Sequence, residues 1–293
     1  MKYRKEIFAI AVPAIISNIT TPLLGLVDVA ITGRIGAAVY IGAIAVGGTM
    51  FNMLYWLFGF LRMGTSGLTA QAYGASDVKA QSLVLWRALL LGALAGLFFV
   101  IFSGPMCDVV LRFMDADGST AVLAARYFRI CIWGAPAVMC TYALAGWFLG
   151  MQDSRSAMWM AIATNVANIL FSATLVFVFH WKIEGVATGT MCAQWVGVAL
   201  GLTIVYVLYR PCRVALSDLF DRGRLIAFFK INTDIFLRTC CLVAVTVWFT
   251  HAGALQGADI LAANALLLQL FMLFSYFMDG FCLLSPSPSP RAS

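Results

Sequence analysis

The chain has 293 residues, of which 62% are hydrophobic and 11% are charged, and its mean hydropathy is +0.92. Because the apolar share of soluble domains is about half, this composition excludes an ordinary soluble fold and indicates an all-α polytopic membrane protein. The formal net charge is +6, but the basic residues stand between apolar runs and form no nucleic-acid-reading motif, so we expect no nucleic-acid partner.

The first apolar run, residues 7–30, is predicted to be a membrane-spanning helix with an unusual polar content. It has the roughly 20 residues that a bilayer crossing needs, yet it contains Asn18 and the carboxylate Asp28. A carboxylate in a spanning helix is costly unless it faces a wet cavity or a partner, so Asp28 is interpreted as an ion or proton site. Asn18 is a candidate for lining the same cavity. Pro13 and Pro22 free backbone carbonyls, which favours a helix that bends.

Seven further spanning helices are predicted along the chain. Their ranges are 40–61, 83–102, 122–149, 157–179, 186–209, 231–251 and 260–284. The Gly- and Ser-rich segment 63–81 is predicted to end a helix and form a loop. The polar segment 106–120 is expected to be a connection at the membrane surface. Gly134 and Pro136 are expected to break the helix over 122–149.

These elements divide the chain into four parts. Residues 1–209 form a six-helix lobe, 210–230 a basic cytoplasmic connection, 231–284 the first two helices of a second lobe, and 285–293 a Ser/Pro tail. The connections assigned to the side of the N-terminus carry Lys2, Arg4, Lys5, Arg62, Lys79, Arg87, Arg155, Arg210, Arg213, Arg222, Arg224 and Lys230. The other side carries mainly Arg34, Arg112 and Lys182. The positive-inside rule therefore predicts a cytoplasmic N-terminus in the plasma (inner) membrane.

The eight cysteines lie mostly inside apolar runs and show no C-x-x-C spacing. We interpret them as small helix-packing residues, with no disulfide framework and no metal site.

A weak internal repeat relates residues 40–63 to residues 259–282. It pairs the second predicted helix with the eighth, and hence the first with the seventh, as in transporters built from two repeated halves with the site between them. The alternating Ser-Pro tail cannot continue a spanning helix. It is interpreted either as a flexible cytoplasmic tail or, more in keeping with a break inside the repeat, as the result of a frameshift or truncation. A chain truncated in this way is not expected to transport on its own.

Two stretches, PLLGLVDVAITGRIG and LRMGTSGLTAQAYGA, resemble the multidrug and toxic compound extrusion (MATE) family, and most closely its DNA-damage-inducible branch. The resemblance covers about residues 7–281. It implies two six-helix lobes around a central cavity and an antiporter that exports cationic or amphipathic small molecules. The export would be driven by protons or sodium ions, with no other cofactor.

The resemblance also assigns roles to single residues. Asp28 matches the acidic position of the family's first helix and would be the coupling site; the alternative is a carboxylate that caps the kink or pairs with an arginine. Asn165 and Asn168 match asparagines of the fifth helix and share one face, although helix–helix hydrogen bonding explains them nearly as well. Ser172 stands where the family has an acid, which removes a second ionisable group. Gln194 could face the same cavity or pack against a neighbouring helix.

The sequence contains no G-x-x-x-x-G-K-[ST] run, so we expect no direct ATP drive, and no nucleophile–base constellation, so we expect no enzyme. Two other functions stay open. One is a non-transporting membrane remnant or a partner that binds a full-length relative. The other is a lipid-precursor flippase on a similar fold, against which Asp28 and the proline kinks argue.

Overall fold

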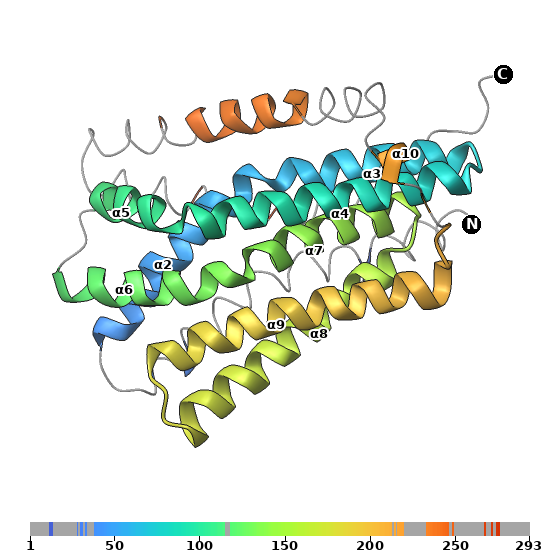
Figure 1. Ribbon diagram of the computed structural model, residues 1–293. Helices are drawn as coiled ribbons and strands as arrows, with labels where there is room; N and C mark the ends of the chain where they lie inside the picture. Colours follow the sequence, from blue (N-terminus) through green and yellow to red (C-terminus); the bar gives the residue numbers. More distant parts are fainter. Residues whose placement is uncertain are drawn as a thin grey trace.

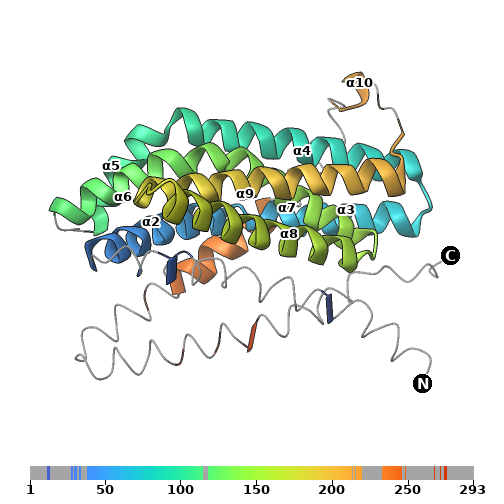
Figure 2. The ribbon, with the colours of Figure 1, turned by 90° about the horizontal axis from the view of Figure 1, so that it is seen from below.

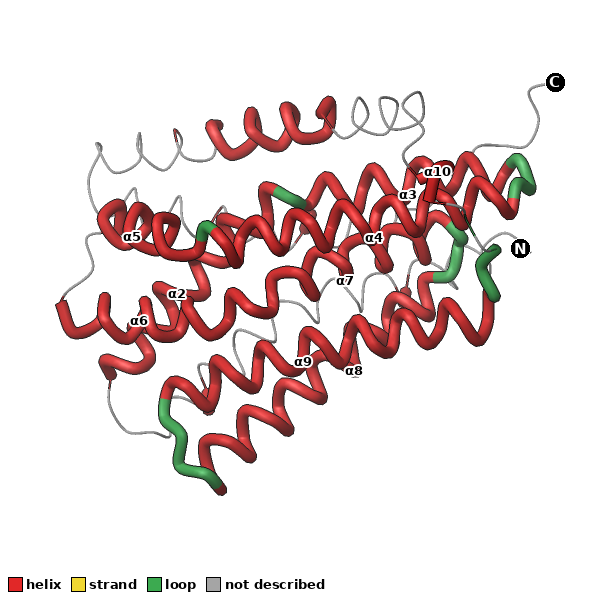
Figure 3. The backbone as a smooth tube through the Cα atoms, in the orientation of Figure 1, coloured by secondary structure: helices red, strands yellow, loops and turns green. Residues whose placement is uncertain are grey.

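All regular structure in the described part of the chain is helical. The computed structural model (Figure 1) describes residues 12–13, 28, 30–31, 33, 38–114, 118–212, 214, 216–219, 233–245, 248, 267, 271 and 274–275. No strand occurs among these residues, and only short turns separate their helices, as Figure 3 shows. The predicted all-α fold is therefore confirmed.

The helices lie lengthwise beside one another (Figures 1 and 2). Their bounds are α2 Ala38–Leu57, α3 Gly59–Gly74, α4 Val78–Ile101, α5 Ser103–Met114, α6 Gly118–Cys131, a 3₁₀ turn Ile132–Gly134, α7 Ala135–Gly150, α8 Ser154–Ala173, α9 Ile183–Ile204 and α10 Leu216–Leu219. A π-helical turn extends α8 over Thr174–Val178, and another extends α9 over Val205–Tyr209. Residues 233–245 are helical as well.

Four helical stretches have the length and hydropathy to cross a membrane. They are Val78–Ile101, Thr120–Gly150, Ser154–Val178 and Ile183–Tyr209, with 24, 31, 25 and 27 residues. Their outward faces expose large apolar side chains, such as Leu97 and Phe98 of α4 and Val207 after α9, which suits contact with lipid. The chain is thus a multi-pass membrane protein. These stretches contain the helices predicted over 122–149 and 186–209, and they end one residue before the ends predicted for the helices over 83–102 and 157–179.

Short turns with capping aspartates join the helices at one end of the bundle. Asp77 precedes α4 and accepts a hydrogen bond from the Ala80 amide at 2.9 Å, and Asp153 precedes α8 and accepts one from the Ser156 amide at 3.1 Å. Such side chains satisfy amide groups that a helix leaves unpaired in its first turn. Figure 1 shows that the turn between α3 and α4 and the turn between α7 and α8 lie at the same end of the bundle.

The prediction of a loop within segment 63–81 is wrong over most of its length, because α3 continues to Gly74. The small polar residues that suggested a loop pack instead against α7. A Cβ atom added at Gly150 of α7 would lie 2.7 Å from the Ser66 carbonyl oxygen, and one at Gly146 would lie 3.1 Å from Thr65 Cβ. Small residues at such crossings let two backbones approach closely within a membrane.

Segment 106–120, predicted to be a surface connection, is also largely helical, since α5 reaches Met114 and α6 starts at Gly118. The expected break near Gly134 and Pro136 is confirmed in a mild form. The 3₁₀ turn ends at Gly134, and Pro136 lies in the first turn of α7, where the missing amide proton costs nothing.

Little of the proposed second lobe can be compared. The helix over 233–245 agrees with the predicted seventh helix, and Phe236 packs edge-on against Phe60 with ring centroids 5.8 Å apart. Of the predicted eighth helix, residues 267, 271, 274 and 275 are described, and all are helical. The rest of the second repeat copy and the Ser/Pro tail lie outside the described residues.

Candidate functional site

A buried polar cluster joins the first predicted helix to α8 and α9; we define it as Asp28, Asn168, Ser172 and Thr190. Asp28 is helical and only 4% exposed. The hydroxyl of Thr190 on α9 lies 3.1 Å from Asp28 Oδ2. Asn168 on α8 donates from Nδ2 to the same hydroxyl oxygen at 2.9 Å. Three segments that are distant in the sequence thus meet through one threonine.

The close packing of α9 against α8 (Figures 1 and 2) holds this cluster together. Asn168 and Ser172 are one turn apart on α8, and both are fully buried. Gly189 of α9 faces Ser172, and a Cβ atom at Gly189 would lie 2.6 Å from the Ser172 amide nitrogen. Because glycine leaves this space free, the neighbouring Thr190 can reach the carboxylate.

Two buried oxygen atoms of the cluster could accept further hydrogen bonds or bind a cation. Asn168 Oδ1 and Ser172 Oγ have no hydrogen-bond partner among the residues that the structure describes. A buried oxygen without a partner is unfavourable, so both atoms are available to a proton donor, a water molecule or a small cation.

The apolar packing around the cluster limits access of water. Val186 and Ala187, which precede Thr190 on α9, belong to a buried core with Tyr127 and Phe128 of α6. Phe128 in turn stacks on Phe51 of α2 with ring centroids 4.8 Å apart. Charge on Asp28 is therefore balanced mainly by the neighbouring polar groups and not by bulk water.

The structure brings together three of the residues singled out in the sequence, Asp28, Asn168 and Ser172. Asn165 is half-buried on α8 and lies one turn before Asn168. Gln194 is also half-buried; it packs beside Gly134, its Cβ 3.8 Å from the position that a Cβ atom would take there. Neither is part of the cluster as defined.

Of the two prolines predicted to kink the first helix, the structure describes one. Pro13 is helical and buried, whereas Asn18 and Pro22 lie outside the described residues. Their assignments as a cavity residue and a kink residue stay predictions.

Thr190 is the functional candidate that the sequence reasoning missed. One signal was present, because Thr190 precedes Gln194 by four residues and therefore lies on the same face of the predicted helix. A threonine in a spanning helix commonly bonds to its own backbone, and Thr190 Oγ1 does lie 3.0 Å from the Val186 carbonyl oxygen. The pattern alone did not distinguish this role from the contact with Asp28.

Comparison with known proteins gives consistent matches. The family model described as MatE matches residues 13–174. The DNA damage-inducible protein F of Escherichia coli (strain K12) is 37% identical over 281 residues, which are 94% of this chain and 61% of that protein. The probable multidrug resistance protein NorM of Thermotoga maritima is 24% identical over 216 residues, 71% of this chain and 45% of that protein.

Solved structures show the same fold. A crystal structure of MATE in the bent conformation superposes with a TM-score of 0.81 at 20% identity, covering 96% of this chain and 63% of that one. A multidrug resistance MATE family transporter of the MOP superfamily in its outward-facing conformation gives 0.79 at 22% identity, covering 95% and 62%. The chain therefore spans less than two thirds of the length of these proteins.

Proposed function

Because this chain belongs to the MatE family, we propose that it provides the ion-coupling lobe of a secondary active efflux antiporter. In this proposal residues 1–209 form a six-helix lobe, 210–230 connect the lobes, and 231–284 begin the second lobe. Substrate would occupy a cavity between the lobes, as in other transporters built from repeats. Export would be driven by ion entry and not by a nucleotide, since the sequence lacks a phosphate-binding loop.

The observation that supports this proposal best is the burial of Asp28 beside Thr190. The carboxylate is 4% exposed and accepts from a hydroxyl 3.1 Å away. A buried charge on a membrane-spanning segment is energetically unfavourable, so the acids that occur there usually have a function. An ion or proton that neutralises Asp28 would remove this charge, and its release would restore it, so binding there alters the energy of the surrounding helices.

Thr190 would report the state of Asp28 to α9. Its single hydroxyl proton has two acceptors within reach, Asp28 Oδ2 at 3.1 Å and the Val186 carbonyl oxygen at 3.0 Å, while one lone pair is occupied by Asn168 Nδ2. An ionised Asp28 attracts the proton. A neutral, protonated Asp28 can instead donate to Thr190, which then turns its own proton to Val186. The hydrogen-bond direction thus changes with the charge.

The coupling ion would be a proton or a sodium ion. Asn168 Oδ1 and Ser172 Oγ, buried oxygens one turn apart on α8, suit a hard cation, which prefers oxygen ligands. Ser172 cannot ionise in the accessible pH range, so Asp28 is the single acid that the cluster contributes. We infer that the cluster binds one coupling charge and not two.

The remaining features of the proposal follow from the family and from charge. The substrates would be cationic or amphipathic small molecules, and the membrane would be the plasma (inner) membrane. The N-terminus would be cytoplasmic, because Lys and Arg concentrate in the connections of that side.

Labelling with a hydrophobic carbodiimide tests the ion site on the chain itself. The reagent adds to the protonated form of a carboxyl group within an apolar environment. We expect mass spectrometry to locate the adduct on Asp28 in purified protein, with none at this position after Asp28→Asn. If protons are the coupling ion, rising pH suppresses labelling while sodium ions do not; if sodium is, added sodium protects at constant pH.

Asp77→Asn provides the matched control. Asparagine caps a helix as well as aspartate does, so this variant removes one carboxylate while keeping the turn before α4. Its labelling of Asp28 should equal that of the parent chain. Absence of an adduct on Asp28 across the accessible pH range would contradict a neutralisable ion site.

A further inference from the structure

Arg87 is a buried cation inside a membrane-spanning helix. The expectation that Arg87 belongs to a basic connection is wrong, because Arg87 lies within α4. The residue is 5% exposed. A buried arginine in a spanning segment needs acceptors nearby, and its partners indicate its role.

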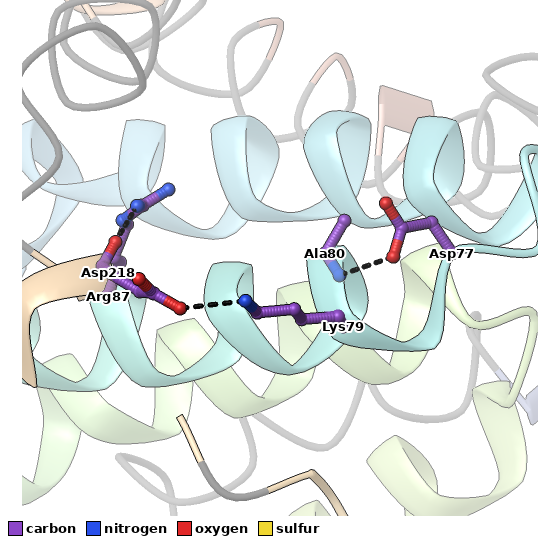
Figure 4. A network of polar contacts seen from close by, with 5 residues as sticks. All are labelled: Asp77, Lys79, Ala80, Arg87 and Asp218. Atoms are coloured by element: carbon purple, nitrogen blue, oxygen red, sulfur yellow. Dashed lines mark hydrogen bonds and ion pairs between the residues drawn. The ribbon is translucent and has the colours of Figure 1, made fainter. Parts of the chain in front are cut away.

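The partners of Arg87 are the last backbone carbonyls of α10 (Figure 4). Its Nε donates to the Leu219 carbonyl oxygen at 2.9 Å, and its Nη2 donates to the carbonyl oxygen of Asp218. The last carbonyls of a helix have no partner within the helix, so a guanidinium that donates to them satisfies them. Two donors from one rigid plane also fix the direction of α10.

Two more contacts attach the same segment to α4. Lys79 Nζ lies 2.9 Å from Asp218 Oδ2, and the amide of Cys212 donates to Ser82 Oγ at 3.1 Å. The ion pair is solvent-accessible, with side-chain exposures of 64% and 37%, so it contributes little by itself. The Ser82 side chain is 2% exposed and that of Arg87 5%, so on the α4 side both contacts are made by buried groups.

The path from α9 to α10 is fixed at its start as well. Tyr209 at the end of the π-helical turn donates to Asp153 Oδ2 at 2.6 Å. Arg210 then adopts a left-handed conformation with φ of 44°, and Pro211 follows it. Such a residue ends a helix sharply. The chain is turned away from α9 and reaches Ser82 of α4 at Cys212.

We propose that Arg87 is a positioning residue that clamps the α10 segment, residues 210–219, onto α4, so that this segment moves as a rigid part of the six-helix lobe. Only the statement that the segment moves with the six-helix lobe rests on the two-lobe arrangement proposed above. The attachment itself is measured without transport.

Limited proteolysis and hydrogen exchange on the full chain in nanodiscs test this attachment. The rate at which trypsin cuts after Arg213 is measured relative to the rates after Arg222 and Arg224, which follow α10 in the sequence and serve as internal references. Arg87→Gln should raise cutting at Arg213 relative to these references by about tenfold, because two charge-assisted hydrogen bonds are lost. Amide exchange in peptides covering 211–219 should rise by a similar factor.

Three further variants separate the clamp from a general loss of structure. Arg155→Gln removes an exposed arginine from the first turn of α8 and should change neither readout. Lys79→Gln should change them by less than about threefold, since an exposed ion pair contributes little. Arg87→Lys keeps the charge without the planar pair of donors, so partial protection should return.

The proposal is overturned if Arg87→Gln leaves both readouts at parent values, or if Arg155→Gln changes them equally. Should Arg87→Gln fail to accumulate in the membrane, Arg87→Lys and a cross-link test whether Arg87 holds the α10 segment on α4. Ser82→Cys should form an oxidative disulfide with Cys212 in the parent background, and the yield should fall when Lys replaces Arg87. An unchanged yield together with unchanged exchange would show that Arg87 does not hold the segment.

Discussion

Thr190 is the residue on which the whole polar cluster depends, because its hydroxyl bridges α8 to Asp28. Valine has nearly the same shape without the hydroxyl. We expect Thr190→Val to reduce the free energy of unfolding by about 1–3 kcal/mol, since Asp28 Oδ2 and Asn168 Nδ2 each lose a buried partner. Thr190→Ser keeps the hydroxyl and should retain most of the free energy of unfolding of the parent protein. Thermal unfolding in detergent measures both.

Thr203→Val on the same helix is the matched control. The Thr203 hydroxyl is exposed and donates to the Ala199 carbonyl oxygen of its own helix at 2.7 Å, so its loss should change the unfolding free energy by less than about 0.5 kcal/mol. Equal effects at the two positions would show that Thr190 has no special role.

At this scale the sequence predicted the acid and its α8 neighbours but not the bridge between them. Asp28 stood out because a carboxylate is rare in a spanning helix. Asn168 stood out because it matches a family asparagine and shares a face with Asn165, and Ser172 because the family has an acid at its position. Thr190 did not stand out, since threonine is common in such helices and its partner lies 162 positions away in the chain. A contact of this length depends on helix packing, which periodicity does not encode.

The α8–α9 pair depends on Gly189 for its close contact. We expect Gly189→Ala to destabilise the protein by about 1–3 kcal/mol, because the new methyl group would meet the backbone of Ser172 and force the helices apart. The same change should weaken the contact between Thr190 and Asp28. Thermal unfolding and carbodiimide labelling of Asp28 report the two effects separately.

Gly67→Ala in α3 is expected to stabilise the protein, in contrast to Gly189→Ala. No atom outside its helix lies within 4 Å of a Cβ atom at Gly67, so alanine should raise stability by up to about 1 kcal/mol through its helix propensity. If both substitutions destabilise equally, the close approach at Gly189 is not what limits substitution there.

Elements with continuous apolar runs were predictable, and those formed from small polar residues were not. The spans that contain α4, α8 and α9 follow from hydropathy alone. Helix α3 was misread because Gly, Ser and Thr usually indicate loops, whereas Thr65 and Ser66 are buried against glycines of α7. Arg87 was counted with the cations of the connections although the predicted helix over 83–102 contains it, because the orientation argument treats every Lys and Arg near a helix end alike.

For the whole molecule, the ends of the described bundle should lie on opposite sides of the membrane. The turn between α3 and α4 and the connection between α8 and α9 are at opposite ends of the bundle in Figure 1. Reporter fusions after Lys5, Ser76 and Arg222 should report the cytoplasm, and one at Lys182 the exterior, because basic connections are retained inside. A cytoplasmic signal at Lys182 would require a different number of crossings.

Ion-driven efflux measured in vesicles tests most directly the claim that Asp28 couples ion entry to export. The assay uses this chain alone and this chain followed by the second half of the Escherichia coli relative, with Asp28→Asn and Asp77→Asn in each. Where the unsubstituted protein exports a cationic dye under a proton or sodium gradient, Asp28→Asn should reduce export to that of empty vesicles, and Asp77→Asn should leave it unchanged. Gradient-dependent export that survives Asp28→Asn would contradict the account.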